Sequence, residues 1–348
     1  MSADVRSSAE GADSDVLDLL VVGAGPTGIS IGAEARKAGL SVLLVDRGGL
    51  TAAIQGYPTF MEFFTTRDRL EIAEVPFSIP EDKPTRRQAL AYYRFVVDRY
   101  KIPFALHEQV TEVTREPGEE RVFRVVAEAA SPRIGEPRVR RARAVAFATG
   151  YFGNPNRLGV PGEDLPHVHN RYLEPYPHFG ERVTIVGAGN TAVEAALDLW
   201  RNGAKVTLVH RRQATKPGVK YWLKPDIENR VAEGSIAARF ESVVHAFRPG
   251  EVEISGLGSE AREILPADAV YVLIGYRPEM ELLARSGVAI EPETLLPAFA
   301  PATCETNVPG LYVAGTIQAG RATDRIFIEN SRDHGGLIVG HLRHRLGR

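Results

Sequence analysis

One stretch of 29 residues occurs twice along the chain, at 19–47 and at 183–211, without a gap and at an offset of 164 positions. Each copy starts with an apolar run, passes through a glycine-rich turn into an amphipathic segment, and ends in a second apolar run. This order is typical of strand, turn, helix and parallel strand. The repeat therefore predicts an α/β protein with two Rossmann-like dinucleotide-binding folds.

The turn of the first copy carries the spacing G-x-G-x-x-G in the expected strand–turn–helix setting. The first glycine permits the tight turn, the second lets the backbone approach a pyrophosphate, and the third lets helix and strand pack closely. The helix start offers free N–H groups to phosphates, and an acid at the end of the second strand suits ribose hydroxyls. The predicted binding residues are Gly23, Gly25, Pro26, Thr27, Gly28, Asp46 and Arg47.

The second copy keeps the turn but changes the end of its second strand. Gly187, Gly189, Asn190 and Thr191 form the turn, while His210 replaces the acid and is followed by Arg211 and Arg212. A neutral imidazole followed by guanidiniums suits a 2′-phosphate, because arginine donates paired hydrogen bonds to phosphate oxygens. Lys216 adds a point charge nearby. We therefore expect NADPH here in preference to NADH; a solvated basic turn, or a copy that binds nothing, remains the alternative.

Composition narrows the class of protein. The 348 residues allow two domains, with 44% hydrophobic and 25% charged residues as in ordinary soluble proteins. A net charge of −2 gives no reason to expect nucleic acid or an anionic membrane. The single cysteine, Cys304, excludes an internal disulfide, and no apolar run reaches the roughly 18 residues of a membrane span. Residues 1–16 are expected to be a disordered tail and the protein cytoplasmic.

The remaining segments have weaker patterns. A helix is expected at 85–100, strands at 104–112, 121–129, 139–148, 269–276 and 310–315, and a helix at 328–348. On the last helix, Leu337, Ile338, Leu342 and Leu346 form an apolar face that is expected to lie in the core. Five arginines within 133–143 are interpreted as a solvated β-ribbon face. The cations Lys83, Arg86 and Arg87, near the start of the 85–100 helix, are expected in solvent or, less simply, on an anionic ligand.

Four motifs in order, the first glycine turn, Thr149-Gly150, the second turn GAGNTA and the run GLYVAG at 310–315, resemble the two-dinucleotide-binding flavoprotein superfamily. This resemblance implies that the first fold binds FAD and that an inserted second fold binds NAD(P)H. It implies an FAD domain at 17–176 and 296–348, and an NADPH domain at 177–295. It also places Thr149, Gly150, Gly315, Thr316, Ile328 and Asn330 near the FAD, the last two through the start of the C-terminal helix.

Three longer runs, at 57–77, 83–97 and 326–336, are similar to the bacillithiol disulfide reductase family, which is thioredoxin-reductase-like but lacks a Cys-x-x-Cys pair. The resemblance implies a homo-oligomer, a dimer or larger, and an aromatic segment after the first fold that lines the flavin. Thr27 stands where that family typically has a cysteine, and Thr316 stands where many relatives of the superfamily have an acid. Because the Thr27 hydroxyl cannot form a mixed disulfide, thiol–disulfide exchange is expected to be weak or absent. Cys304 is either an inert small hydrophobe or a redox group.

The first-ranked hypothesis is an FAD-dependent NADPH oxidoreductase, with hydride passing to the flavin and electrons onward to a low-molecular-weight disulfide or another small-molecule or small-protein acceptor. The alternatives are a ferredoxin–NADP reductase, a flavin monooxygenase-like enzyme that lacks the F-x-G-x-x-x-H fingerprint, and a non-enzymatic module that responds to redox state. No metal site is expected, because His167 and His169 have no apparent third ligand nearby.

Overall fold

A computed structural model describes residues 16–130 and 133–348. The chain divides into two compact units. The first unit contains the chain up to Gln55, Met61–Asn154 and Arg277–Arg348, and the second contains Gly56–Phe60 and Pro155–Tyr276. The tail predicted at 1–16 lies outside the described residues except for Val16. Within the described ranges, no helix is both long enough and apolar enough to cross a membrane.

The first unit is built on a five-stranded parallel sheet of order β16-β7-β1-β2-β3. Its strands are β1 (Leu19–Val22), β2 (Val42–Asp46), β3 (Phe104–Leu106), β7 (Val145–Phe147) and β16 (Leu311–Val313). β1, β7 and β16 are buried throughout, which is why they appear in the sequence as continuous apolar runs.

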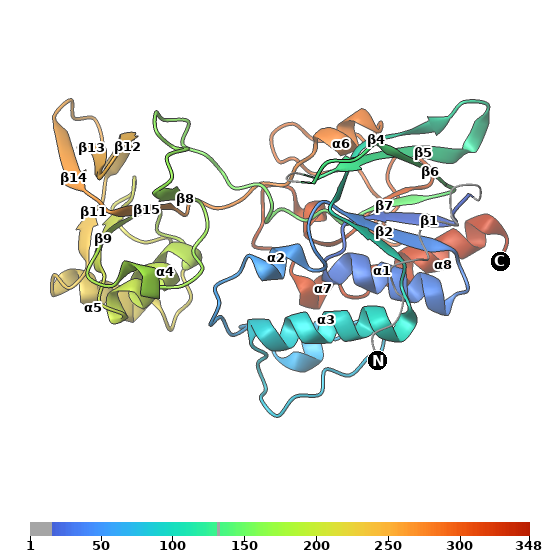
Figure 1. The fold of residues 1–348 in the computed structure, drawn as a ribbon, viewed down its shortest axis with the longest axis horizontal. Coiled ribbons are helices and arrows are strands. Elements are labelled where there is room, and N and C mark those ends of the chain that lie inside the picture. Colours follow the sequence, from blue (N-terminus) through green and yellow to red (C-terminus); the bar gives the residue numbers. More distant parts are fainter. Residues whose placement is uncertain (1–15, 131–132) are drawn as a thin grey trace. The chain divides into compact units, whose positions relative to one another are not determined.

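Helices cover one face of this sheet, and a second, antiparallel sheet covers the other (Figure 1). The helices are α1 (Pro26–Lys37), α3 (Arg86–Tyr100) and α8 (His334–Leu346), and the antiparallel strands are β4 (Glu108–Glu116), β5 (Glu119–Ala129) and β6 (Arg138–Ala142). Two predicted strands are therefore divided: 104–112 into β3 and β4, and 139–148 into β6 and β7. His107, with a φ of 61°, marks the first break.

The predicted C-terminal helix is also divided, into α7 (Ile328–Ser331) and α8. Gly335 lies so close to α1 that a Cβ there would be 2.8 Å from Ser30 Oγ. On α8, Ile338 and Leu342 are fully buried as predicted, but the placement of Leu337 in the core is wrong, because 41% of it is exposed. The contact with α1 therefore uses a narrower face of α8 than the four apolar residues indicated.

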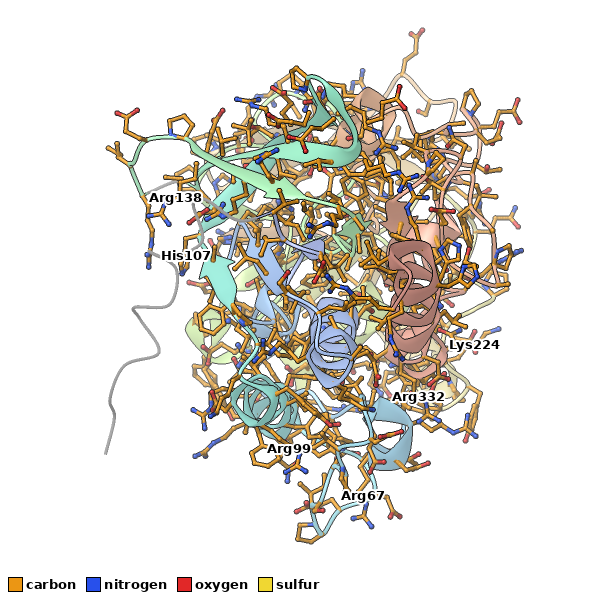
Figure 2. The ribbon with its side chains drawn as sticks, turned by 90° about the vertical axis from the view of Figure 1, so that its right-hand side faces the viewer. Arg67, Arg99, His107, Arg138, Lys224 and Arg332 are labelled. Carbon is orange, nitrogen blue, oxygen red and sulfur yellow. The ribbon has the colours of Figure 1, made fainter. Side chains whose placement is uncertain are left out.

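The segment between β2 and α3 contains α2 (Ala52–Gln55) and η1 (Arg67–Leu70) and is attached to the unit by hydrogen bonds. Arg86 is half-buried and donates to the carbonyl oxygens of Ile54 (3.1 Å) and Gln55 (2.5 Å), at the end of α2, so its guanidinium binds the chain itself. Arg332, labelled with Arg67 in Figure 2, donates to Asp68 O at 2.8 Å.

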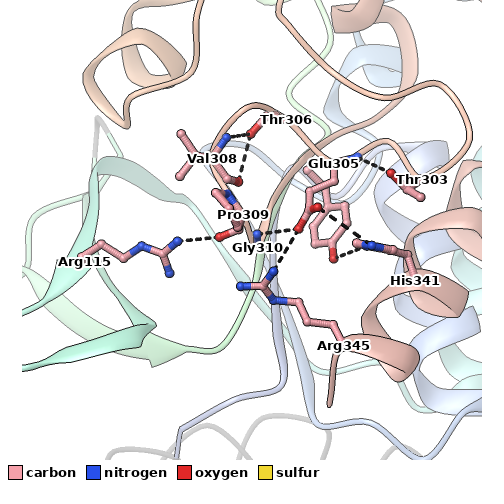
Figure 3. Close-up of polar contacts among 10 residues, drawn as sticks. Arg115, Thr303, Glu305, Thr306, Val308, Pro309, Gly310, His341 and Arg345 are labelled. Atoms are coloured by element: carbon pink, nitrogen blue, oxygen red, sulfur yellow. Dashed lines mark hydrogen bonds and ion pairs between the residues drawn. The ribbon is translucent and has the colours of Figure 1, made fainter. Parts of the chain in front are cut away.

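The return connection before β16 is fixed by one carboxylate (Figure 3). Glu305 accepts from the backbone N–H of Gly310 at 2.8 Å and from Arg345 at 3.3 Å. Next to it, Tyr312 Oη and His341 Nδ1 are 2.9 Å apart. These contacts attach α8 to the start of the last strand, so the C-terminal stretch belongs to the first unit.

The arginines of 133–143 are largely paired with carboxylates. Arg138 and Arg140 both contact Glu108, Arg141 contacts Glu119, and Arg143 contacts Asp18. The expectation of solvated side chains holds for Arg138, labelled in Figure 2, but not for Arg140, whose side chain is 13% exposed.

The second unit repeats the architecture of the first. Its parallel sheet has the order β11-β10-β9-β15-β8, with β8 (Val168–His169), β9 (Arg182–Val186), β10 (Lys205–Val209), β11 (Ala237–Arg239) and β15 (Ala269–Val272). Its other elements are η2 (Tyr176–His178), α4 (Asn190–Arg201), α5 (Lys224–Ala232) and the antiparallel strands β12 (Ser242–Arg248), β13 (Glu251–Gly256) and β14 (Arg262–Pro266). The predicted fold class, two Rossmann-like α/β domains, is confirmed.

The second unit begins and ends earlier in the chain than the predicted boundaries of 177 and 295. It begins earlier because β8 pairs with β15 and so joins the second sheet. It ends earlier because α6 (Glu281–Arg285) contributes Leu283 to the core of the first unit, together with Met280 and Val288.

The chain passes between the two units at 154–155 and at 276–277, and we call these two segments the linkers. They run antiparallel, with a bridge between Pro155 and Tyr276 and a hydrogen bond from Arg277 N to Asn154 O.

Candidate functional site

In the first glycine turn, Gly23 and Gly28 have no room for a side chain, whereas Gly25 faces open space. Gly23 has a φ of +114°, and a Cβ there would lie 2.4 Å from Ala148 O. A Cβ on Gly28 would lie 2.0 Å from Gly23 O. At Gly25, by contrast, a Cβ would meet nothing within 4 Å, and its φ of −80° is accessible to any residue. Only the open position lets another molecule approach the backbone.

The start of α1 has the features of an anion site. Its N-cap residue, Gly25, makes no side-chain cap, and the first turn, beginning at Pro26, carries no acidic residue. The first N–H groups of the helix therefore lack the side-chain acceptor that usually satisfies them. Unsatisfied N–H groups at the positive end of the helix dipole favour a phosphate.

Asp46 has a structural role that the sequence did not reveal. Its Oδ2 accepts from Ala24 N and its Oδ1 accepts from Gly48 N, both at 2.7 Å. The carboxylate thus ties the glycine turn to the end of β2, and each oxygen keeps a lone pair for a ribose hydroxyl. Arg47 pairs with Glu279 at 3.2 Å and lies against Gly153.

Residues from four segments of the first unit meet beside this turn. A Cβ on Gly315 would lie 2.7 Å from Thr27 Oγ1, and one on Gly150, which has a φ of +65°, would lie 3.4 Å from Thr316 Oγ1. Thr27 Oγ1 is 3.3 Å from Ser331 Oγ. Thr149 is exposed next to Gly150. The structure therefore brings Thr27 close to Gly315, and Gly150 close to Thr316.

His334 belongs to this group and was not predicted. Its Nδ1 accepts from Gly315 N at 3.1 Å. Burial holds the pKa of His334 below its ordinary value, despite the opposing charge of Asp333. The neutral imidazole fixes the start of η3 (Gly315–Ala319). No sequence motif marks this histidine, so the sequence analysis could not identify it.

The Asn330 side chain forms hydrogen bonds with the backbone just before α7. Its Oδ1 accepts from Phe327 N at 2.7 Å and its Nδ2 donates to Arg325 O at 2.8 Å. These bonds are those of an ordinary first-turn residue that caps α7. The preceding Glu329 accepts from Thr65 at 2.7 Å, and Ile328 is half-buried.

The glycine turn of the second unit repeats the close contact of the first. Gly187 has a φ of +133°, and a Cβ there would lie 2.3 Å from Leu273 O. Ala192, in the place of Gly28, is fully buried, so the third position tolerates a methyl group here. The N-cap residue of α4, Gly189, again makes no side-chain cap, and the first turn has no acid. Thr191 is exposed at the helix start.

The end of β10 carries cations around a neutral histidine. His210 is buried, and burial, followed by the charges of Lys216, Arg212 and Arg211, holds its pKa below the ordinary value. Both arginines are exposed, and neither makes an ion pair within the described part of the chain. Two buried atoms there, His210 Nε2 and Thr215 Oγ1, have no hydrogen-bond partner among the described residues. Buried polar atoms normally have one, so a ligand or water is needed at this turn.

The described residues contain no group of three or more His, Cys, Asp or Glu that could hold a metal ion. His169 lies against the ring of Tyr271, with centroids 5.2 Å apart. Burial, and the neighbouring His178 and His167, hold the pKa of His169 below its ordinary value.

Comparison with known proteins identifies the family. The family model described as pyridine nucleotide-disulphide oxidoreductase matches residues 20–315. The chain belongs to this family. Members of this family are enzymes, so the chain is an oxidoreductase and not a non-enzymatic module that only binds its cofactors.

Relatives cover almost the whole chain. The bacilliredoxin reductase Bdr of Bacillus subtilis is 36% identical over 326 residues, 94% of this chain and 97% of that protein. The solved structure of the bacillithiol disulfide reductase Bdr of Bacillus cereus has a TM-score of 0.89 at 34% identity, covering 95% of this chain and 100% of that one. A thioredoxin reductase of Lactococcus lactis, at 18% identity and a TM-score of 0.72, shares the fold.

A ferredoxin–NADP reductase of Ignicoccus hospitalis is 28% identical over 93% of this chain and 95% of its own length. The resemblance to the disulfide reductase group is confirmed, and this ferredoxin reductase is a more distant relative.

We predict that Cys304 is chemically inert in the folded protein. It is 1% exposed, and burial raises the pKa of its thiol despite a hydrogen bond with Gln318. Because the thiolate is the reactive form, iodoacetamide at pH 8 should label it far more slowly in the native state than in urea. Cys304→Ala should leave reductase activity within about twofold. Rapid native labelling, or loss of activity in this variant, would contradict the prediction.

Proposed function

We propose that this protein is an FAD-dependent NADPH oxidoreductase whose acceptor is a low-molecular-weight disulfide. The observation that carries the proposal is the contrast between two otherwise matching turns. One ends in the carboxylate of Asp46, and the other ends in neutral His210 followed by Arg211 and Arg212. Two different dinucleotides, one without and one with a 2′-phosphate, fit these two ends.

The residues of the first turn fit FAD. Gly25 leaves its backbone open to a pyrophosphate, the start of α1 is uncapped, and Asp46 retains acceptor capacity for ribose. Thr27, Gly315 and Thr316 meet beside the turn, where the flavin side of the molecule would be held. When bound, FAD supplies the redox chemistry, taking a hydride from the nicotinamide and releasing two electrons to the acceptor.

The residues of the second turn fit NADPH. The buried atoms His210 Nε2 and Thr215 Oγ1 have no hydrogen-bond partner in the described part of the chain, and a ligand can supply one. Arg211 and Arg212 are exposed cations with no carboxylate to neutralise them in the described chain. A 2′-phosphate at this turn gains charge-assisted hydrogen bonds that the 2′-hydroxyl of NADH cannot provide.

The proposed acceptor rests on the relatives, two of which are a bacilliredoxin reductase and a bacillithiol disulfide reductase. The balanced reaction is NADPH + H⁺ + RSSR → NADP⁺ + 2 RSH. Thr27 offers a hydroxyl, and Cys304 is buried, so neither residue supplies an exposed protein thiol for this reaction. For the same reason ferredoxin–NADP reduction is the second candidate, favoured by a full-length relative at 28% identity.

Gly25→Ala tests the FAD site. Its backbone conformation and the open space around it accommodate alanine, so the free energy of unfolding of the apoprotein should stay within about 1 kcal/mol of wild type. The methyl group would occupy the path of the pyrophosphate, so FAD affinity should fall at least about tenfold. The matched control is Gly336→Ala, also in open space but on the outer face of α8. Full FAD content in the Gly25 variant would refute the assignment.

Arg211→Ala and Arg212→Ala test the choice of nicotinamide cofactor. Each lost charge-assisted contact costs about 1.5–3 kcal/mol, or roughly tenfold to a hundredfold in affinity. The Michaelis constant for NADPH should rise accordingly, while that for NADH should stay nearly constant. Arg201→Ala, at the opposite end of α4, serves as the control. Equal effects on both cofactors would mean that these arginines do not read the 2′-phosphate.

The acceptor is tested by steady-state NADPH oxidation with bacillithiol disulfide, glutathione disulfide and ferredoxin, each under anaerobic conditions. The relatives overturn the expectation from Thr27 that disulfide reduction is weak, so we expect the disulfides to support turnover and Cys304→Ala to retain it. Turnover with ferredoxin alone would favour the second candidate. Thr27→Cys provides a gain-of-function comparison, because a thiol at this position beside Gly315 restores the residue expected from the disulfide reductase resemblance.

A further inference from the structure

We propose that Asn190 is a positioning residue that fastens a strap, residues 216–220, across the second glycine turn and so places Lys216 on the pyrophosphate of the pyridine nucleotide. This inference rests on the proposed function of the second unit. It assigns to Asn190 an indirect role, through Lys216, in place of the direct contact with the cofactor that the sequence indicated.

Three hydrogen bonds fasten the strap. Asn190 Oδ1 accepts from Lys220 N at 2.8 Å, and Asn190 Nδ2 donates to Gly218 O at 3.3 Å. The backbone N–H of Lys216 donates to Ala188 O, inside the glycine turn, at 3.0 Å. Both polar atoms of the Asn190 side chain are thus engaged with the strap, and Asn190 is the first residue of α4.

The strap is anchored on its other side as well. Val219, at its centre, is 5% exposed and belongs to the hydrophobic core of the second unit. Lys220 Nζ bonds Glu194 Oε1 on α4 at 2.6 Å. A segment anchored by a core side chain, an ion pair and the Asn190 amide has one defined position above the helix start.

Lys216 crosses the turn at the place where a phosphate would bind. A Cβ on Gly189 would lie 3.7 Å from Cδ and 3.9 Å from Nζ of Lys216. No carboxylate of the described residues pairs with this ammonium group. A cation at the start of a helix opposes the helix dipole, and an anion bound between them relieves this repulsion. Thr215, one residue earlier, adds a buried hydroxyl without a partner.

The first unit has a counterpart of the backbone hydrogen bond from Lys216 to Ala188, but not of the side-chain hydrogen bonds of Asn190. Thr51 N donates to Ala24 O at 2.9 Å, which matches the bond from Lys216 to Ala188. The position equivalent to Asn190 is Pro26, whose side chain cannot form hydrogen bonds. The side-chain hydrogen bonds of Asn190 therefore distinguish the unit proposed to bind the exchanging cofactor from the unit proposed to bind FAD.

Asn190→Ala, Lys216→Ala and the double variant test the strap through NADP⁺ and NAD⁺ affinity, measured by calorimetric titration of the oxidised holoenzyme. Because both nucleotides contain the pyrophosphate, each single variant should weaken both by the same factor, about tenfold. The double variant should be no weaker than Lys216→Ala, since the two residues act on one contact. Asn229→Ala, an exposed asparagine on α5, should match wild type.

Unchanged affinities in Asn190→Ala, or additive losses in the double variant, would overturn the role of Asn190. A loss confined to NADP⁺ in Lys216→Ala would mean that Lys216 reads the 2′-phosphate, which also contradicts the proposal. Lys216 is exposed, so its variant reports even where Asn190→Ala lowers the melting temperature. Failure of the proposed function is seen separately, as equal effects of Arg211→Ala and Arg212→Ala on NADPH and NADH.

Discussion

Both units depend on one backbone contact that only glycine permits. At Gly23 and at Gly187 the space of a side chain is filled by a carbonyl oxygen, from Ala148 and from Leu273. Each contact locks the turn after the first strand to the end of the neighbouring strand. This fixes the start of α1 or α4 relative to the carboxyl edge of its sheet, which is where ligands bind in open α/β sheets.

The two units share this frame and differ in what surrounds it. In the first, Asp46 holds the turn through Ala24 and leaves acceptor capacity outward. In the second, cations follow His210, and the turn is held through Asn190. Under the proposed function, the carboxylate of Asp46 accepts hydrogen bonds from an unphosphorylated ribose, whereas the guanidiniums after His210 hold a 2′-phosphate. The two units therefore share a scaffold and differ in the side chains at the ends of their strands.

Much of this could be predicted from sequence, because periodicity and turn glycines are local signals. The strands β1, β2, β9, β10, β15 and β16, with α1, α3 and α4, lie where the patterns placed them, whereas β8 and β11 were not predicted. The misses are long-range. The pairing of β8 with β15 joins segments about a hundred residues apart, and the exposure of Leu337 depends on how closely Gly335 approaches α1. Likewise, the bonds of Asp46 and Asn330 use backbone groups that carry no residue signature.

The antiparallel pairing of the linkers has a consequence for the history and engineering of the chain. Pro155 and Tyr276, the ends of the main segment of the second unit, are bridge partners. A domain whose entry and exit points adjoin can be inserted into a host loop without forcing the host's flanking residues apart. The same property makes the second unit a candidate for exchange between reductases, with the bridge at 155 and 276 as the splice point.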